Sequence, residues 1–469
     1  MGEQQHGQGA PWTVEDLQRA TGGQWHDARR PDRDRLGAVV TDSRRVQPGE
    51  VFLALRGERF DAHDFVAQVA AAGAGAVVVS RPVTVDVPQL VVEDTRLALG
   101  RLGRFHRQQM TGLKVAALTG SSGKTTTKQM LGSILSQQGP TLMTRGNLNN
   151  DLGVPMMLLE LQPEHQFAVM ELGANHVGEI GYTTALVQPD VAAVLNIGTA
   201  HMGEFGGREG IARAKSEIFS GLGAAGVAVI PAQDDFVAVL SAAAAGHQPV
   251  RFGAGGEVDA GAIALHPAHS TFELVCPQGR VPVVLPFAGR HNIDNALAAA
   301  ALALALGVDL QTIASGLASA ANVRGRLTFL ADFAGQPGVT VIDDTYNANP
   351  HAVRAAAQVL CQQAGQRLLV LGDIAELGDD AEAEHFALGQ ALAALPLDGL
   401  YATGPLSAHT VAGYRQAGGQ NALHAPECPQ LVQALQAQMS TGPRPLTLLF
   451  KGSRSARMET LIDALEEMA

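Results

Sequence analysis

The sequence is poor in cysteine. Cys276, Cys361 and Cys428 are the only cysteines among 469 residues. Because their number is odd and they lie far apart, the sequence predicts neither a disulfide framework nor the closely spaced thiolates of a zinc site. We expect three reduced, buried thiols.

Long hydrophobic segments are absent as well. The longest uncharged run of alanine and leucine covers residues 296–308, whereas a membrane-spanning helix needs about 20 apolar residues. Residues 1–10 are polar and lack the apolar core of a signal peptide. We therefore expect a cytoplasmic protein without membrane insertion.

Basic residues are outnumbered by acidic ones. The chain has 33 lysines and arginines against 45 aspartates and glutamates, for a formal net charge of −12. This balance argues against a protein that coats nucleic acid or an anionic membrane. Anionic small molecules remain possible ligands, because loops and helix N-termini bind phosphates locally.

What the chain does contain favours several α/β domains. The chain is longer than a domain with a single hydrophobic core usually is, and 46% of its residues are hydrophobic. Its 53 glycines suit tight junctions between strands and helices. We predict domains at residues 1–93, 94–323 and 324–469. The first is a small α/β unit, and the third alternates strands and helices as a βαβ sheet does.

The middle domain is expected to contain buried parallel strands, because its apolar runs are short and each is followed by Gly, Asn or Pro. From about residue 251 to 286 the pattern becomes glycine-rich and alternating, which predicts antiparallel strands. A long helix is expected to follow at His291. The runs read as parallel strands are 115–118, 167–171, 191–195 and 227–230.

The first of these strands leads into a glycine loop that ends in Gly123-Lys124-Thr125 and precedes a helical pattern. Gly120 and Gly123 allow a tight turn with inward-pointing amides, and the following helix adds its positive N-terminus. Lys124 is expected to reach the outer phosphates of a nucleotide, and the Thr125 hydroxyl suits Mg²⁺. An ordinary strand–helix turn is the alternative, but it would not require a lysine followed by three threonines.

Other polar side chains follow the middle strands, where α/β proteins place their sites. Glu171 is expected either to hold Mg²⁺ beside Thr125 or to cap the next helix. Asn196 and His201 follow the next strand, where a histidine is more often structural than a metal ligand. Lys215 lies on a helix and, from its spacing alone, is a solvated charge.

The third domain offers two further groups. Residues 343–350, Asp-Asp-Thr-Tyr-Asn-Ala-Asn-Pro, provide either ligand-binding groups or an Asx-rich helix cap. Lys451 and Arg454 are expected to open a last helix from Ser455, where the helix dipole disfavours cations. An anionic ligand would explain that conflict, and an exposed loop would tolerate it.

These motifs resemble those of the Mur ligases of peptidoglycan synthesis, which are ATP-dependent amide-forming enzymes. The resemblance covers about residues 41–458, and the short glycine loop is the family's own form. The motifs occur in the family's order: 119–125, 149–155, 171–176, Asn196 with His201, Lys215, 289–292, 325–326 and Asp344.

The resemblance implies a small N-terminal α/β domain that binds a UDP-sugar, a central ATPase-type parallel sheet and a C-terminal Rossmann-like α/β domain. It also implies two Mg²⁺ ions, with Thr125 and Glu171 holding one and His201 the second. Lys215 matches the lysine that is carbamylated in this family, and Lys124 and Arg326 would stabilise the transferring phosphate. The implied ATP-binding residues are Gly120, Ser121, Ser122, Gly123, Lys124, Thr125, Thr126, Asn292, Asn295, Arg326 and Asp344.

Within the family, residues 52–65, 171–176, 343–350 and 451–455 are similar to the branch that joins D-alanyl-D-alanine to UDP-N-acetylmuramoyl-tripeptide. Those two molecules are the expected partners, and the enzyme is expected to be a monomer. The implied substrate-binding residues are Ser43, Arg44, Asn149, Asn150, Tyr346, Asn347, Asn349 and Lys451.

Three alternatives stay open. A sibling ligase that adds the third-position amino acid is expected to carry Asp-Asn-Pro-Arg, which is missing from this sequence. A folylpolyglutamate-synthetase type of ligase would lack the first-domain stretches 41–44 and 52–65. A nucleotide-dependent switch would not need the paired Asp343 and Asp344 together with His201 and Lys215.

Overall fold

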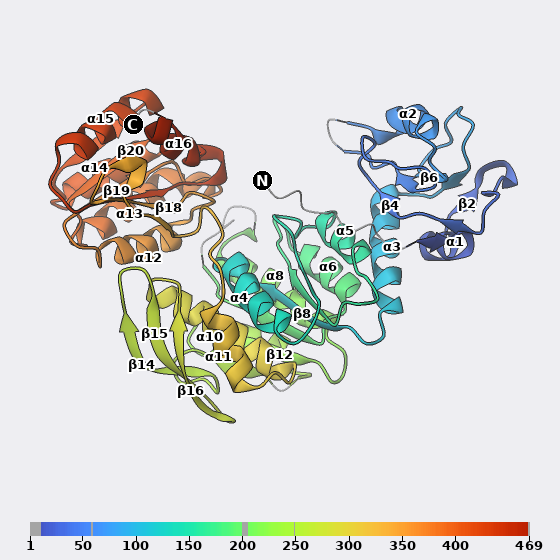
Figure 1. The fold of residues 1–469 in the computed structure, drawn as a ribbon, viewed down its shortest axis with the longest axis horizontal. Coiled ribbons are helices and arrows are strands. Elements are labelled where there is room, and N and C mark those ends of the chain that lie inside the picture. Colours follow the sequence, from blue (N-terminus) through green and yellow to red (C-terminus); the bar gives the residue numbers. More distant parts are fainter. Residues whose placement is uncertain (1–10, 58–59, 199–204, 248, 468–469) are drawn as a thin grey trace.

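The computed structural model of the protein describes residues 11–57, 60–198, 205–247 and 249–467. His201 therefore lies outside the described residues. Three α/β domains follow one another along the chain, as predicted, and the middle one lies between the other two (Figure 1). Within the described ranges, no helix is long and apolar enough to cross a membrane.

The first domain is built on a five-stranded sheet. Its elements are β1 (Trp12–Thr13), α1 (Val14–Thr21), β2 (Gln24–Trp25), η1 (His26–Ala28), β3 (Arg35–Leu36), β4 (Val39–Val40), β5 (Val51–Leu53), η2 (Ala62–Phe65), α2 (Val66–Ala71), β6 (Ala76–Val79), β7 (Gln89–Val91) and α3 (Thr95–Gln109). The strand order is β2-β7-β6-β5-β4, with only β2 antiparallel. Helix α3, capped by Asp94, leads to the central domain (Figure 1).

The central domain contains a six-stranded parallel sheet. Its elements up to residue 252 are β8 (Lys114–Thr119), α4 (Lys124–Ser136), β9 (Thr141–Met143), α5 (Gly153–Leu159), β10 (Phe167–Glu171), α6 (Glu179–Val187), β11 (Val191–Val194), α8 (Arg208–Ser216), η3 (Glu217–Gly221), β12 (Val227–Pro231), α9 (Val237–Ala243) and β13 (Val250–Phe252). The order is β13-β12-β11-β8-β10-β9. Because β8 lies inside this sheet, the glycine loop opens at its carboxyl edge.

Both faces of that sheet are covered, which explains why its strands are apolar without alternation. The remaining elements are β14 (Asp259–Leu265), β15 (Ser270–Cys276), β16 (Gly279–Leu285), α10 (Arg290–Ala305) and α11 (Leu310–Ala318). One hydrophobic core joins α4, α10, α11 and the small β14–β16 sheet to one face. A second core joins α5, α6, α8 and α9 to the other.

The third domain has a six-stranded sheet in the order β17-β18-β22-β19-β20-β21, parallel except for the edge strand β17. Helices α12 to α14 cover one face, and α15 and α16 the other. Its elements are β17 (Thr328–Leu330), η4 (Phe333–Gly335), β18 (Val339–Asp344), α12 (Pro350–Leu360), β19 (Gln366–Leu371), η5 (Gly378–Asp380), α13 (Ala381–Ala393), β20 (Gly399–Thr403), α14 (Ser407–Gln416), β21 (Ala422–Ala425), α15 (Cys428–Thr441), β22 (Leu446–Lys451), η6 (Arg454–Ala456) and α16 (Glu459–Glu467).

Three expectations about local structure were wrong. The antiparallel region begins at Asp259 rather than 251, because β13 pairs in parallel with β12. The last α-helix begins at Glu459, and Lys451 ends β22, so no helix dipole opposes its charge. Only Cys276 is buried, since Cys361 is half-buried and Cys428 exposed, although all three thiols are free.

Candidate functional site

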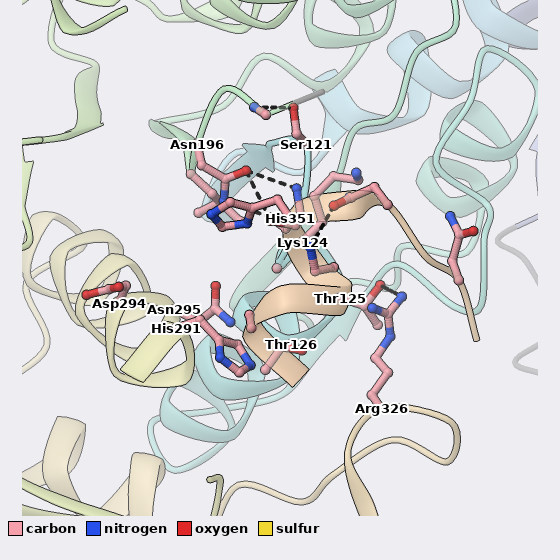
Figure 2. A pocket seen from close by; sticks show the side chains of 18 of the residues that line it. Ser121, Lys124, Thr125, Thr126, Asn196, His291, Asp294, Asn295, Arg326 and His351 are labelled. Carbon is pink, nitrogen blue, oxygen red and sulfur yellow. Dashed lines mark hydrogen bonds between the residues drawn. The ribbon is translucent and has the colours of Figure 1, made fainter. Parts of the chain in front are cut away.

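The glycine loop between β8 and α4 forms the centre of the site (Figure 2). Gly123 has a φ of +78°, and a Cβ at this position would lie 2.2 Å from Asn295 Oδ1. Glycine is therefore required both by the backbone conformation and by the close approach of α10. Lys124 Nζ donates to Gly120 O over 2.7 Å, so the lysine lies along its own loop.

Asn196, which follows β11, holds the loop in shape. Its Oδ1 accepts from Ser122 N at 3.0 Å, and its backbone oxygen accepts from Ser121 N at 3.1 Å. Ser121 Oγ in turn accepts from Gly198 N at 2.9 Å (Figure 2). These bonds tie the loop to the segment after the neighbouring strand and fix its shape, with the amides of Ser121 and Ser122 occupied by Asn196.

Glu171 lies beside Thr125, as predicted, and does not cap a helix. It ends β10 with 3% of its surface exposed, and its Oε2 accepts from Thr125 Oγ1 at 3.1 Å. Asn149 Nδ2 donates to Glu171 Oε1 at 2.9 Å, and the buried Lys128 ammonium lies 3.5 Å from Oε2. Hydroxyl, amide and carboxylate oxygens are the hard ligands that Mg²⁺ prefers, so these residues fit that ion.

Lys215 is not the solvated residue that its helical spacing indicated. Its residue surface is 2% exposed, on α8, and it faces the same cavity as Lys124. Burial and the positive charge of Lys124 hold the pKa of Lys215 well below its usual value. No hydrogen bond or ion pair links its amine to the residues that the structure describes. An uncharged amine is the form that reacts with electrophiles.

One third-domain residue, Arg326, reaches the loop, and a second, Tyr346, packs against the arginine. Arg326 Nη2 donates to Thr125 Oγ1 over 2.9 Å, and the Tyr346 ring lies 4.4 Å from the Arg326 guanidinium carbon (Figure 2 shows the arginine pointing to Thr125). Arg326 Nε is buried without a hydrogen-bond partner in the described parts of the chain. Since a buried cationic donor is costly to leave unpaired, this atom points to an anionic ligand.

Asp344 and Lys451 pair with each other at the edge of the third-domain sheet. Lys451 Nζ lies 2.6 Å from Asp344 Oδ2, and both residues line the cavity. Lys451 Nζ also donates to Asn347 O at 2.9 Å. The cation that the sequence placed at a helix N-terminus is thus neutralised inside the domain.

Asn347 and Asn349 have structural contacts in addition to their position at the cavity. Asn349 Oδ1 accepts from Ala352 N at 2.8 Å and caps α12, and Asn347 Oδ1 accepts from Arg454 N at 3.3 Å. Residues 343–350 therefore contain a helix cap and also contribute side chains to the cavity wall. Binding of a substrate by these asparagines stays a prediction.

Asn292 and Asn295 lie on the first turns of α10, next to the loop. Asn292 Nδ2 donates to Ala288 O at 2.8 Å, and Asn295 Nδ2 donates to Asn292 Oδ1 at 3.0 Å. His291 lies on the same helix (Figure 2). Burial, with the nearby charges of Lys451 and His351, lowers its pKa to about 4, so its imidazole is neutral at physiological pH.

A cavity of about 1010 Å³ collects these side chains from the central and third domains. Gly120 does not line it, and His201 cannot be placed. The predicted residues that line the cavity are Ser121, Ser122, Gly123, Lys124, Thr125, Thr126, Asn149, Asn150, Glu171, Lys215, Asn292, Asn295, Arg326, Asp344, Tyr346, Asn347, Asn349 and Lys451.

Sequence reasoning missed several basic side chains of the site. Lys128 contacts Glu171, and His351 and Arg354 line the cavity from the first two turns of α12. A cation near a helix N-terminus opposes the dipole, and this conflict was a usable signal for Arg354. Burial lowers the pKa of His351, so its imidazole does not add to that conflict. Lys128 gave no such signal, because its burial depends on β9 and β10 packing over α4.

A second cavity, of about 490 Å³, lies between the first and central domains. It is lined by Thr41, Asp42 and Arg45 from one side and by Arg145 and Glu160 from the other. Ser43 and Arg44, predicted to bind the UDP-sugar, adjoin it in sequence but do not line it. Arg44 is exposed and pairs with Asp42 at 2.7 Å, which holds the pKa of that carboxyl at about 2.

Models of known families match three parts of the chain. The Mur ligase family catalytic domain matches residues 36–107, the Mur ligase middle domain residues 118–303, and the Mur ligase glutamate ligase domain residues 325–454. Together these matches cover the three domains in order.

Individual relatives cover nearly the whole chain. The UDP-N-acetylmuramoyl-tripeptide–D-alanyl-D-alanine ligase of Escherichia coli is 46% identical over 92% of this chain and 94% of its own length. A crystal structure of MurF from Acinetobacter baumannii is 54% identical, with a TM-score of 0.93 over 98% of this chain and 99% of that one. The MurF ligase of Thermotoga maritima in complex with ADP is 28% identical, with a TM-score of 0.82 over 92% and 97%.

Proposed function

The chain belongs to the Mur ligase family. We propose that it catalyses the ligation of D-alanyl-D-alanine to UDP-N-acetylmuramoyl-tripeptide in peptidoglycan precursor synthesis. The observation that carries this substrate assignment is the 46% identity to the Escherichia coli ligase over 92% of the chain. The cavity between the central and third domains supplies the nucleotide site that an ATP-dependent ligase needs.

The reaction needs ATP because a carboxylate has no usable leaving group at neutral pH. The terminal carboxylate oxygen of the tripeptide attacks the γ-phosphorus of ATP, and ADP leaves. The neutral amine of D-alanyl-D-alanine then attacks the carbonyl carbon of the acyl phosphate. The bond between that carbon and the phosphate oxygen breaks, inorganic phosphate leaves, and the nitrogen loses a proton. The protein contributes mainly positioning and charge stabilisation.

The glycine loop holds the phosphates. Its amides and the N-terminus of α4 receive the β- and γ-phosphates, and Lys124 turns from Gly120 O toward them. Arg326 places a second cation beside the transferring group from the third domain. A Mg²⁺ ion held by Thr125 and Glu171 would neutralise phosphate charge, and the expected second ion would involve His201.

Lys215 acts after carbamylation in this proposal. Its neutral amine attacks CO₂, a C–N bond forms and one proton is released, so that a buried amine becomes an anion. The lowered pKa supports this step, because a protonated ammonium has no lone pair with which to attack. The resulting carboxylate belongs beside the catalytic cations rather than in a hydrophobic core.

The experiment is a release assay for ADP with each substrate omitted in turn. ADP is expected only when ATP, UDP-N-acetylmuramoyl-tripeptide and D-alanyl-D-alanine are all present. Lys124→Ala should abolish release, whereas Lys114→Ala, which removes an amine that donates to Leu306 O away from the site, should not. Robust turnover with a single free amino acid in place of the dipeptide would contradict the substrate assignment. Monomeric state and cytoplasmic location stay predictions.

A further inference from the structure

Helix α4 carries a second buried lysine, Lys128, behind the lysine of the glycine loop. It lies one turn after Lys124 and three residues after Thr125, so helical spacing places the three side chains on neighbouring positions. Its residue surface is 1% exposed, and it does not line the cavity. A nucleotide in that cavity would therefore contact Lys124 but not Lys128. Lysine is almost never fully buried unless its charge is paired.

Thr144 fixes the position of both Lys128 and its acidic partner Glu171. Lys128 Nζ donates to Thr144 O at 2.7 Å, and Glu171 N donates to Thr144 Oγ1 at 2.9 Å. Thr144 follows β9 and is buried, and its own amide donates to Val169 O in β10 at 2.9 Å. The separation of the two charges is therefore set by the backbone of two neighbouring strands.

The ammonium group of Lys128 is close to the carboxylate without forming a short hydrogen bond to it. Lys128 Nζ lies 3.5 Å from Glu171 Oε2, whereas a charge-assisted hydrogen bond from nitrogen to oxygen spans about 2.7–2.9 Å. Asn149 Nδ2 and Thr125 Oγ1 use two of the roughly four lone-pair positions of this carboxylate. Lys128 thus offsets the negative charge of Glu171 while oxygen lone pairs stay available to a metal ion.

The other charges near Glu171 are also unfavourable for a divalent cation that arrives alone. Thr125, the second expected ligand, accepts a hydrogen bond from Arg326 Nη2 at 2.9 Å, and Lys124 lies directly before it in the chain. A lone Mg²⁺ ion would meet these two cations and a carboxylate whose charge Lys128 already offsets. The phosphates of a nucleotide bring negative charge to the same place, which reverses the balance.

We propose that Lys128 makes metal binding at Glu171 depend on the nucleotide. In the nucleotide-free protein its positive charge weakens the attraction between Glu171 and Mg²⁺, so the ion enters together with the phosphates of ATP or ADP. This inference rests on the proposed function, because it concerns the metal–nucleotide step of that reaction. Lys128 is a positioning residue in this scheme, since it acts on the ion through Glu171.

The test uses Mn²⁺, which takes the same oxygen ligands as Mg²⁺. The electron paramagnetic resonance signal of free Mn²⁺ is lost on binding, so a titration gives the affinity without any turnover. In the absence of nucleotide, Lys128→Met is expected to bind one Mn²⁺ ion at least about tenfold more tightly than the wild type, because a neighbouring positive charge is gone. Excess Mg²⁺ should displace the Mn²⁺.

Two controls assign this gain to the pair of charges. Lys114→Met removes a lysine whose amine donates to Leu306 O away from the site, and it should bind Mn²⁺ as the wild type does. Adding Glu171→Gln to Lys128→Met removes the carboxylate as well and should abolish the gain. A lysine with a purely structural role would lower stability when replaced, but its loss would not create a metal site.

Nucleotide binding separates this inference from the proposed function. Calorimetry should show that Mg²⁺ strengthens the binding of ADP to the wild-type protein. If the wild type binds ADP neither with nor without Mg²⁺, the proposed function fails, whatever the nucleotide-free variants do. If ADP binds as expected while Lys128→Met gains no metal affinity, only the role of Lys128 fails.

Lys128→Gln provides a second neutral variant, since its amide can still donate to Thr144 O if methionine weakens folding. An unchanged Mn²⁺ affinity in both neutral variants would overturn the inference, and so would an equal gain in Lys114→Met or a gain that survives Glu171→Gln. The wild type supplies a further check that requires no variant. If it binds Mn²⁺ as tightly without nucleotide as with ADP, the inference is wrong.

Discussion

Arg326 Nη2 donates a hydrogen bond to Thr125 Oγ1 over 2.9 Å, which connects the start of the third domain to the glycine loop of the central one. The same hydroxyl donates its proton to Glu171 Oε2 at 3.1 Å. A hydroxyl has one proton and two lone pairs, so one lone pair remains for a metal ion. The local geometry thus couples the expected Mg²⁺ ligand to the position of the third domain.

Replacing Thr125 tests that coupling. Thr125→Val removes the hydroxyl while keeping its shape, and we expect kcat/KM to fall at least about tenfold with a higher Mg²⁺ requirement. Thr125→Ser retains the hydroxyl and should remain close to wild type. Titration of ADP formation against Mg²⁺ measures both, and an unchanged Mg²⁺ requirement in the valine variant would remove Thr125 from the metal site.

The buried Lys128 ammonium should matter for stability through Glu171. Removing it in Lys128→Met leaves the Glu171 carboxylate buried without its cation, which we expect to lower the free energy of unfolding by about 3–5 kcal/mol. Urea denaturation measures the loss. The control is Arg280→Ala, which breaks the exposed pair with Glu273 and should cost less than about 1 kcal/mol. Equal losses would show that burial of the first pair is unimportant.

Gly123 should not tolerate a side chain. Gly123→Ala meets both an unfavourable φ of +78° and the Asn295 side chain at 2.2 Å, so the loop must shift. We expect ADP affinity, measured by calorimetry, to fall at least about tenfold because the phosphate-binding amides lose their alignment. Gly112→Ala, with open space around it, should bind ADP normally. Normal ADP binding by Gly123→Ala would contradict this account of the loop.

The sequence predicted those parts of the site whose residues lie close together in the chain. Strand, glycine loop and helix are consecutive, so the phosphate site followed from one stretch. Glu171 was found because a carboxylate ending a buried strand is unusual. In contrast, the burial of Lys215 and Lys128 depends on packing between distant elements, which spacing along one helix does not report.

The third domain shows the same limit. Its alternation of strands and helices was predictable. Lys451 was nevertheless placed at a helix N-terminus, because its partner, Asp344, is remote in sequence and pairs with it only across adjacent strands. The parallel pairing of β13 was missed because a three-residue edge strand followed by glycines has no distinctive period. The wrong predictions therefore concern residues whose surroundings are set by tertiary packing.

His291 predicts a pH dependence of stability. Its pKa is lowered from 6.5 to about 4 in the folded protein, so below pH 6.5 the unfolded chain binds a proton that the folded one does not. The contribution of His291 is therefore present above pH 6.5 and is lost as the pH falls toward 4. Relative to His291→Asn, the wild-type free energy of unfolding should decline by about 1 kcal/mol per pH unit across this window. Parallel curves for the two proteins would contradict the shift.

Lys215 provides the sharpest test of the proposed chemistry, because its burial alone would also suit an inert residue. Lys215→Ala removes the amine that carries the carbamate, so pentapeptide synthesis should fall by at least about 100-fold. Short carboxylates such as acetate or propionate should restore part of the activity by entering the vacated space, whereas chloride at equal ionic strength should not. The matched variant Arg213→Ala, on the same helix, should lose little and gain nothing from carboxylates. Because the effect concerns an anion beside catalytic cations, ADP binding measured by calorimetry should change far less than turnover. An active Lys215→Ala variant, or an inactive one that no carboxylate rescues, would leave the lysine with a structural role and remove the carbamate from the mechanism.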